Sequence, residues 1–335
     1  METANCPSFR PFRLGRHAHL QTIAAVFLRG KPDQELATRQ IVSLSDGDRL
    51  VIHDNRPMTW NPGDRIAIFF HGLCGSHASP YVARAARKIR ATGVRTIRVD
   101  FRGFGDSALI SRHHLYAGCS QDLRDVVQHV HQLSPTSQIS LIGFSIGASI
   151  MLKTLGEWSS AYPKFVDSAV AVSPPIDLAH SCANLQNNGN RIYDHYFVRQ
   201  LKANLAVRRR KVSRLVDNNV NPLPNRLVHF DDQFTGPVWG FSGARDYYEK
   251  CSSGPLLTKV QVPTIMLASK DDPVVPFQMF SSWPMSSKIN LVTTRRGGHL
   301  GFLGLHRSDP DRHWMDWRIC RWIEAVNNGT GHLSG

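Results

Sequence analysis

The chain has 335 residues, and its 40 Lys and Arg against 26 Asp and Glu give a formal net charge of +14. With glycine counted and tyrosine left out, about 46% of the residues are apolar, which is typical of globular proteins and excludes disordered, collagen-like and coiled-coil chains. No apolar run approaches the roughly 18 residues of a membrane-spanning helix, and residues 1–16 lack the apolar segment of a secretory signal. We therefore expect a soluble, cytoplasmic protein.

The six cysteines are scattered along the chain, and no two of them form a Cys-x-x-Cys pair. Disulfide frameworks belong to short secreted chains, and zinc sites need closely spaced pairs of ligands. The close histidine pairs have no Cys or carboxylate companion at ligand spacing, and residues at i and i+2 do not share a helix face. We therefore expect free thiols, no bound metal and no other cofactor.

The densest basic run covers residues 208–211, three arginines and a lysine, with Arg214 close behind. Such a run can attract nucleic acid or anionic lipid, but the solvated face of a surface helix is the simpler interpretation. No zinc-finger spacing, RNA-binding aromatic strand or leucine zipper accompanies it, so we expect no nucleic-acid partner. Peripheral contact with an anionic membrane surface stays open, because apolar residues such as Leu201 and Leu205 interleave with the basic ones.

From about residue 38, short apolar and β-branched runs alternate with amphipathic segments. Within residues 122–133 the apolar positions recur at i, i+3, i+4 and i+7, which predicts a helix, and residues 315–326 repeat the pattern. Several of the runs between such segments are continuously apolar, as in strands that are covered on both faces. This alternation predicts an α/β fold with a mostly parallel, doubly wound sheet of about eight strands. The predicted strands cover residues 40–44, 50–54, 66–70, 95–101, 139–143, 169–173, 264–269 and 289–293.

Residues 176–257 break the alternation, because they contain few strand patterns and many polar, basic and Asn residues. They stand between the predicted sixth and seventh strands, so we interpret them as an insertion carried by the sheet. Residues 1–37 precede the sheet and should pack on its outside. The prediction is one domain over residues 1–335, with an N-terminal extension and one insertion.

The strongest local motif is a Gly-x-Ser-x-Gly string between a predicted strand and a predicted helix, the context that a nucleophile elbow requires. In such a turn Ser145 adopts positive φ, so the residues two before and two after it must lack bulk. Its hydroxyl then projects above the sheet near a helix N-terminus, where backbone amides favour negative charge. The string reads Gly143-Phe144-Ser145-Ile146-Gly147.

A serine hydroxyl needs a base and an orienting acid to become a nucleophile. Asp271 and Asp272 follow the predicted strand at 264–269, and His299 follows the strand at 289–293 between small residues. The order Ser, Asp, His is that of α/β-hydrolases. Of the two acids we favour Asp272, since Pro276 stands four residues after it; the other acid could cap the following turn.

An acyl-transfer site also needs an oxyanion hole, two N–H donors aimed at the developing negative charge. A His-Gly turn follows the strand at 66–70 and places the N–H of Leu73 opposite the elbow. The second predicted donor is the N–H of Ile146, the residue after the nucleophile. Cys74, in the same turn, is interpreted as a small loop residue.

Together these motifs resemble the α/β-hydrolase superfamily and, within it, the YheT-like esterases, which are related to abhydrolase-domain lipases. The strings that narrow the resemblance to this branch are Leu20-Gln21-Thr22 and Tyr247-Tyr248. The resemblance implies a triad of Ser145, Asp272 and His299, and it implies that residues 176–257 form a cap over the pocket. The chain departs from the family where Ala148 and Ser149 replace the usual Gly-Asn and where Cys74 replaces a common Glu.

The function predicted from these observations is serine esterase activity on a small-molecule ester with a short- to medium-chain acyl group or a lipid-like structure. Ser145 attacks the acyl carbon and His299 accepts its proton, while Asp272 stabilises the imidazolium. The alternatives are an acyltransferase that passes the same acyl group to an alcohol and a non-catalytic, ligand-binding homologue.

Overall fold

The computed structural model describes residues 9–12, 17–27, 37–305 and 309–329 of the chain. In this part of the chain eight strands form one sheet in the order β1-β2-β4-β3-β5-β6-β7-β8. The pairs β1–β2 and β2–β4 are antiparallel, and every other neighbouring pair is parallel. The predicted, mostly parallel sheet is therefore confirmed. The strands are β1 (Thr38–Ser43), β2 (Arg49–Asn55), β3 (Ile66–Phe70), β4 (Arg95–Asp100), β5 (Ile139–Phe144), β6 (Val166–Val172), β7 (Thr264–Ser269) and β8 (Ile289–Thr294).

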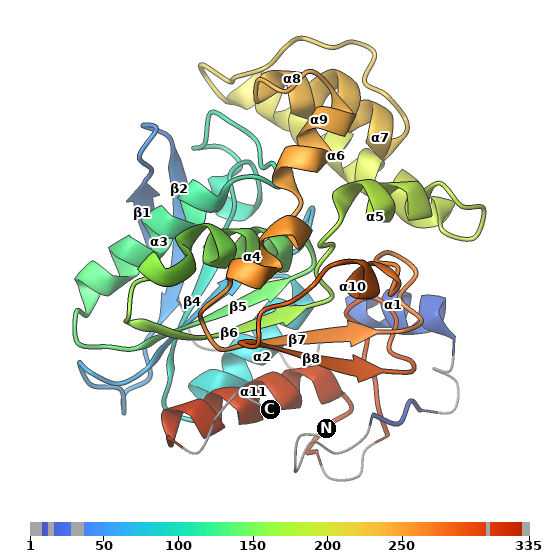
Figure 1. Cartoon of the computed structure of the whole chain (residues 1–335). Coiled ribbons are helices and arrows are strands. Elements are labelled where there is room, and N and C mark those ends of the chain that lie inside the picture. The colour runs from blue at the N-terminus through green and yellow to red at the C-terminus, as the bar shows by residue number, and fades with distance from the viewer. Residues whose placement is uncertain (1–8, 13–16, 28–36, 306–308, 330–335) are drawn as a thin grey trace.

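Helices cover both faces of this sheet (Figure 1). Along β3, Ile66, Ile68 and Phe70 belong to one apolar core with residues of α3 and α4, whereas Ala67 and Phe69 belong to a second core with residues of α2 and α11. Alternate side chains of a strand point to opposite faces, so a strand between two cores must be apolar throughout. The covering helices are α2 (Pro80–Arg90), α3 (Ser120–Leu133), α4 (Ile146–Trp158) and α11 (Trp314–Asn327).

The connection between β6 and β7 holds five helices, at the top of Figure 1, and contains no strand. We call residues 178–251 of this connection the cap segment. A π-helical turn, Asp231–Thr235, interrupts it. The helices are α5 (Leu178–Leu185), α6 (Arg191–Lys211), α7 (Leu227–Phe230), α8 (Gly236–Val238) and α9 (Ala244–Cys251), and the short α10 (Met279–Ser282) follows β7.

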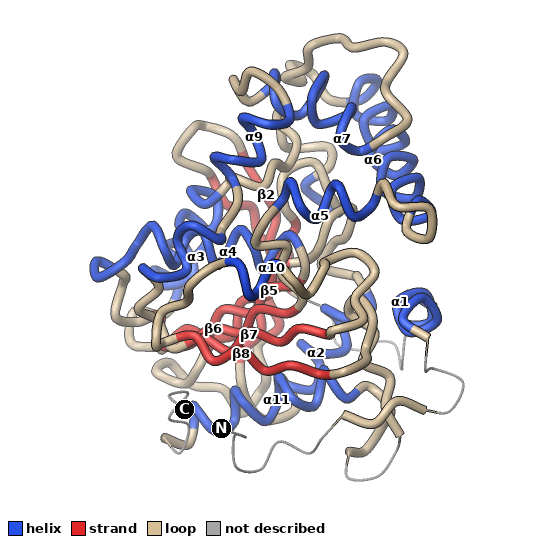
Figure 2. Tube along the Cα trace, turned by 45° about the vertical axis from the view of Figure 1, so that its right-hand side comes forward, coloured by secondary structure: helices blue, strands red, loops and turns tan. Residues whose placement is uncertain are grey.

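The helix α1 (Ala18–Phe27) lies outside the sheet and the helices that cover it (Figure 2). It belongs to the predicted N-terminal extension, of which residues 1–8, 13–16 and 28–36 lie outside the described residues. Its contacts to the loop after β8 are described below. Among the described residues, no helix combines the length and the apolar composition that crossing a membrane requires.

Candidate active site

Ser145 forms the turn between β5 and α4, since β5 ends at Phe144 and α4 begins at Ile146. Its backbone has φ 51° and ψ −124°, the left-handed conformation that the motif predicts. A Cβ at Gly143 would lie 2.5 Å from the Cα of Ala148, and one at Gly147 would lie 2.4 Å from the carbonyl oxygen of His71. Both contacts are too close for any side chain, so the turn requires glycine at both positions.

The loop after β8 brings His299 against this serine. The Nε2 atom of His299 lies 2.9 Å from the Oγ of Ser145, and its Nδ1 lies 2.9 Å from Oδ2 of Asp272. Because an ionised carboxylate can only accept, Nδ1–H donates to Asp272 and Nε2 accepts from the serine hydroxyl. The three predicted residues therefore lie together, and each is only 8% exposed.

The two neighbouring aspartates after β7 have different partners. Oδ1 of Asp272 accepts from the backbone N–H groups two and three residues further along the chain, which orients its other oxygen toward His299. Oδ1 of Asp271 accepts from the N–H of Gly298, at 2.9 Å, next to the histidine. Asp271 thus holds the loop after β8, and the expectation that it caps its own following turn is wrong.

The turn after β3 carries the predicted oxyanion donor Leu73. The N–H of Gly72 donates to the hydroxyl of Tyr81 at 2.9 Å, which anchors the turn against α2. The N–H of Leu73 donates to no backbone group of the described residues, and the N–H of Ile146 belongs to the first turn of α4, where amides have no partner within the helix. Leu73 and Ile146 line a cavity together with Ser145.

Three potential metal ligands, His53, His77 and Asp100, lie within 4.8 Å of one another beside the same turn. The buried carboxylate of Asp100 accepts from both rings, from the N–H of His77 at 2.6 Å and from the N–H of Asp106 at 2.8 Å. These bonds lower the pKa of Asp100 well below its usual range. Asp100 thus joins His77, in the loop after β3, to His53 of β2 and to the turn at Asp106.

The helix α1 contacts the histidine loop directly. The side chain of Gln21 donates to the carbonyl of Leu303 at 3.0 Å and accepts from its N–H at 2.7 Å. The hydroxyl of Thr22 accepts from the N–H of His299 at 2.8 Å. Sequence reasoning missed this role; the Leu20-Gln21-Thr22 string was the available signal, but nothing local relates it to residues almost 280 positions away.

Two cavities meet at Ser145. The cap-side cavity, of about 110 Å³, extends between the sheet and the cap segment, and the histidine-side cavity, of about 410 Å³, lies against His299 and α1. Both are bordered by Leu73, Ser145, Phe197 and Val274. Apolar side chains dominate the cap-side cavity, among them Leu115, Leu178, Leu185, Phe197, Leu201, Phe230 and Phe234.

The cap-side cavity also has polar walls. The π-helical turn presents Asp231, whose carboxylate accepts from the hydroxyl of Tyr248 at 2.7 Å. Single π-helical turns occur frequently at functional sites. Burial raises the pKa of Asp231 to about 6, since a carboxylate in an apolar pocket is poorly solvated.

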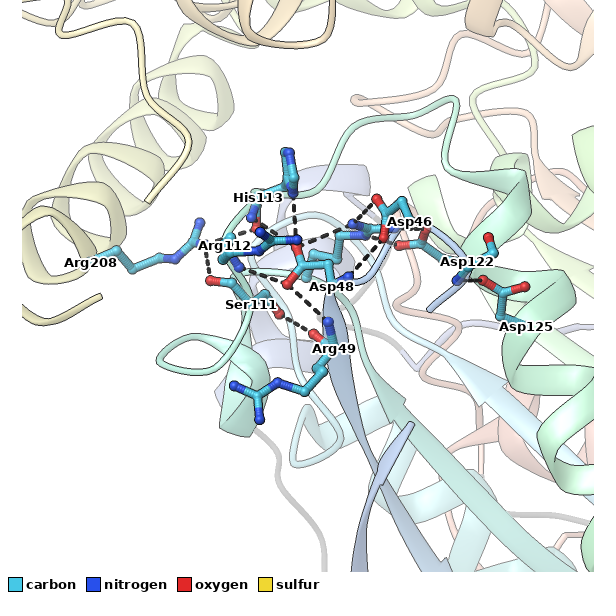
Figure 3. Close-up of polar contacts among 11 residues, drawn as sticks. Asp46, Asp48, Arg49, Ser111, Arg112, His113, Asp122, Asp125 and Arg208 are labelled. Atoms are coloured by element: carbon cyan, nitrogen blue, oxygen red, sulfur yellow. Dashed lines mark hydrogen bonds and ion pairs between the residues drawn. The ribbon is translucent and has the colours of Figure 1, made fainter. Parts of the chain in front are cut away.

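The structure corrects the interpretation of the basic run. Arg208 is 1% exposed, so it belongs to no solvated helix face. It donates to the carbonyls of Ser111 and His113, and this stretch is fixed in turn by N–H groups that donate to Asp48 (Figure 3). Arg209 pairs with Asp217.

Comparisons with known proteins agree with this architecture. A family model described as the alpha/beta hydrolase fold matches residues 68–304, more than two thirds of the chain. The chain is 27% identical to "Putative esterase YheT" of Escherichia coli K12, over 96% of this chain and 94% of that protein.

More distant similarities extend across kingdoms. A monoacylglycerol lipase of Saccharomyces cerevisiae is 27% identical, over 84% of this chain and 62% of that protein's length. The solved esterase Pf2001 of Pyrococcus furiosus superposes with a TM-score of 0.57 at 16% identity, covering 98% of this chain and 100% of that one, which shows a shared fold. On the family match and the sheet topology, the chain belongs to the α/β-hydrolase fold family.

Proposed function

We propose that this protein is a serine esterase in which Ser145, His299 and Asp272 hydrolyse a carboxylic ester through an acyl-enzyme. One observation carries the proposal: the relay from Asp272 through His299 to Ser145, with two contacts of 2.9 Å, opens onto both cavities. The fold family and the esterase and lipase names of its relatives support ester hydrolysis in general.

In the proposed reaction, the oxygen of Ser145 bonds to the acyl carbon while its proton passes to Nε2 of His299. The negative charge on the carbonyl oxygen is stabilised by the N–H groups of Leu73 and Ile146. His299 then protonates the departing alcohol, and water reverses these steps to release the acid and free the serine.

We infer the places of the two halves of the ester from the position of His299. Because His299 must protonate the leaving alcohol, the alcohol leaves on the side of the histidine-side cavity, which this residue borders. The cap-side cavity is bordered by Ile146 and not by His299, so we infer that it receives the acyl group.

The test is steady-state hydrolysis of p-nitrophenyl esters from acetate to dodecanoate, with the released acid quantified and ethanol added in parallel. We expect saturable hydrolysis and the free acid as the main product. Ethyl ester as the main product would instead support the acyltransferase alternative, and no turnover of any ester would contradict the proposal.

Contact with an anionic membrane surface stays a prediction. Fewer basic side chains are exposed for this contact than the sequence suggested. Arg208 is buried and Arg209 is paired, which leaves Arg210, Lys211 and Arg214 exposed on this part of the cap segment. Salt-sensitive binding to phosphatidylglycerol vesicles would support the contact, and binding that is absent or unaffected by salt would contradict it.

A further inference from the structure

Arg208 is a buried cation without a carboxylate. Burying an unpaired charge is costly, and buried arginines normally lie against an acid. Arg84, Arg102 and Arg318, which are 1–3% exposed, follow this rule, since each contacts an aspartate (Asp316, Asp122 and Asp309, respectively). Among the described residues, no Asp or Glu oxygen lies within ion-pair distance of Arg208, which is 1% exposed.

Neutral groups hold this guanidinium in place. Nε donates to the carbonyl of Ala108 at 3.0 Å, and Nη2 donates to the carbonyls of Ser111 and His113 at 2.9 and 2.8 Å. Nη1 has no hydrogen-bond partner among the described residues. Carbonyls orient the cation but carry no negative charge, so the guanidinium has no anionic group in contact with it.

The two carboxylates whose charges act on Arg208, those of Asp48 and Asp217, already have other partners. Asp48 accepts from Arg102 and from the backbone of residues 112 and 113, and Asp217 pairs with Arg209. Burial lowers the pKa of Arg208 to about 10, so the guanidinium is still charged at pH 7.

The same residue borders the cap-side cavity that reaches Ser145. His114 borders it too, and its buried Nε2 has no partner among the described residues. Burial lowers the pKa of His114 to about 3, so its ring is neutral and offers one donor or one acceptor. Ser181, which also lines this cavity, has a buried hydroxyl oxygen without a partner among the described residues. A cavity for a plain alkyl chain would need none of these groups.

We propose that the cap-side cavity receives an acyl group that ends in a carboxylate, and that the side chain of Arg208 binds this carboxylate. The substrate class is then a half-ester of a dicarboxylic acid, or an ester whose acyl chain carries a terminal acid. The carboxylate supplies the negative charge that the protein itself leaves out. This inference rests on the proposed function for its reaction, but the binding step can be measured separately.

The test compares p-nitrophenyl monoesters of adipic, pimelic and suberic acid with p-nitrophenyl hexanoate, heptanoate and octanoate at pH 7.5. At one or more chain lengths, kcat/KM for the acid-ended ester should exceed that for its methyl-ended counterpart by about tenfold or more, the scale of one charge-assisted hydrogen bond. Preference for the methyl-ended ester at all three lengths would overturn the inference.

Two variants test whether the preference for acid-ended esters depends on Arg208. Arg208→Gln keeps hydrogen-bond donors but removes the charge, so it should abolish the preference: kcat/KM for the acid-ended ester should fall at least about tenfold further than kcat/KM for the methyl-ended ester. Arg199→Gln, the same change at an exposed position of the same helix, should behave as the unmodified protein. An equal loss on both esters in Arg208→Gln would show that Arg208 only ties the cap segment to the core. If Arg208→Gln does not fold, competitive inhibition of the unmodified protein by free suberate, but not by octanol, decides the same question.

A binding measurement separates failure of this inference from failure of the proposed function. Suberate should bind Ser145→Ala in calorimetry, and the double variant with Arg208→Gln should bind it at least about tenfold more weakly. If no ester is hydrolysed but suberate binds in this way, the proposed function fails and the binding site stands. If neutral esters are hydrolysed but suberate does not bind, the proposed function stands and the inference fails.

Discussion

The buried charges of the strand-end loops are paired differently from those of Arg208 and Asp231, the two charged residues of the cap segment that border the cap-side cavity. In the loops, each carboxylate has several donors: Asp272 accepts from His299 and two backbone N–H groups, and Asp100 accepts from two rings and two backbone N–H groups. In the cap segment, Arg208 has no carboxylate and Asp231 accepts from hydroxyl groups alone.

This difference follows from what each region has to do. Groups that take part in the reaction must hold one geometry before the substrate arrives, because misplacement by 1 Å can cost a hundredfold in rate. Groups that bind the substrate need spare hydrogen-bonding and ionic capacity in the free protein. The predictions below test this division, first on the loops and then on the cap segment.

The largest effect is expected at the nucleophile. Ser145→Ala should lower kcat for p-nitrophenyl butyrate by roughly 10⁴-fold, because no other group can form the acyl-enzyme. The thermal unfolding midpoint should change little, since only one hydroxyl is removed. Ser160→Ala, at an exposed position after α4, is the matched control and should keep full activity. Residual activity of Ser145→Ala within tenfold of the unmodified protein would refute the assignment.

The two aspartates after β7 should differ strongly. Asp272→Asn removes the charge that stabilises the imidazolium and should lower kcat by about 10³-fold or more. Asp271→Asn weakens two contacts outside the triad, to the hydroxyl of Ser269 and to the N–H of Gly298, so we expect a loss of about tenfold. Both are measured as kcat at saturating ester, and a larger loss in Asp271→Asn would reassign the acid.

A smaller effect is expected where α1 meets the histidine loop. Thr22→Val removes the oxygen that accepts from the N–H of His299 and should lower kcat by about tenfold, with KM nearly unchanged. Thr22→Ser keeps the oxygen and should restore the rate, which distinguishes positioning of the histidine from general packing. Equal rates for the Val and Ser variants would show that the contact is not needed.

The last prediction concerns stability in the cap segment. The raised pKa of Asp231 means that the folded protein holds this proton more tightly than the unfolded chain does. Its ionisation therefore destabilises the fold as the pH rises from about 4 through 6. Asp231→Asn should raise the free energy of unfolding at pH 8 by roughly 2–3 kcal/mol, with no gain at pH 4, in urea titrations. A variant that is less stable at pH 8 would contradict this.

Most of the sheet could be predicted from the sequence because continuous apolar runs occur where strands lie between two cores. The prediction for β6 began late, at residue 169, whereas the strand begins at Val166. Two polar residues follow Val166 in this strand: Asp167 pairs with Arg65, and Ser168 shares a hydrogen bond with Ser140. Neither partner is local, so the pattern of this stretch alone resembles a loop.

The residues of the site also fall into those that could be predicted from the sequence and those that could not. Ser145, Asp272 and His299 could be predicted because strand ends of a parallel sheet meet at one edge, so chain order constrains their place in space. The roles of Thr22 and Arg208 could not, because their partners lie 277 and about 100 residues away. The interpretation of the basic run as a solvated helix face was wrong at Arg208. One position of such a run can face the core, and the sequence of the run alone does not show which one.

The most direct test of the account is labelling with a fluorophosphonate, followed by mass spectrometry of the digested protein. We predict one adduct, on the peptide that contains Ser145, with loss of esterase activity in proportion to labelling and no adduct after Ser145→Ala or heat denaturation. An adduct on a different serine, or full esterase activity in protein labelled at Ser145, would contradict the claim that His299 activates this hydroxyl.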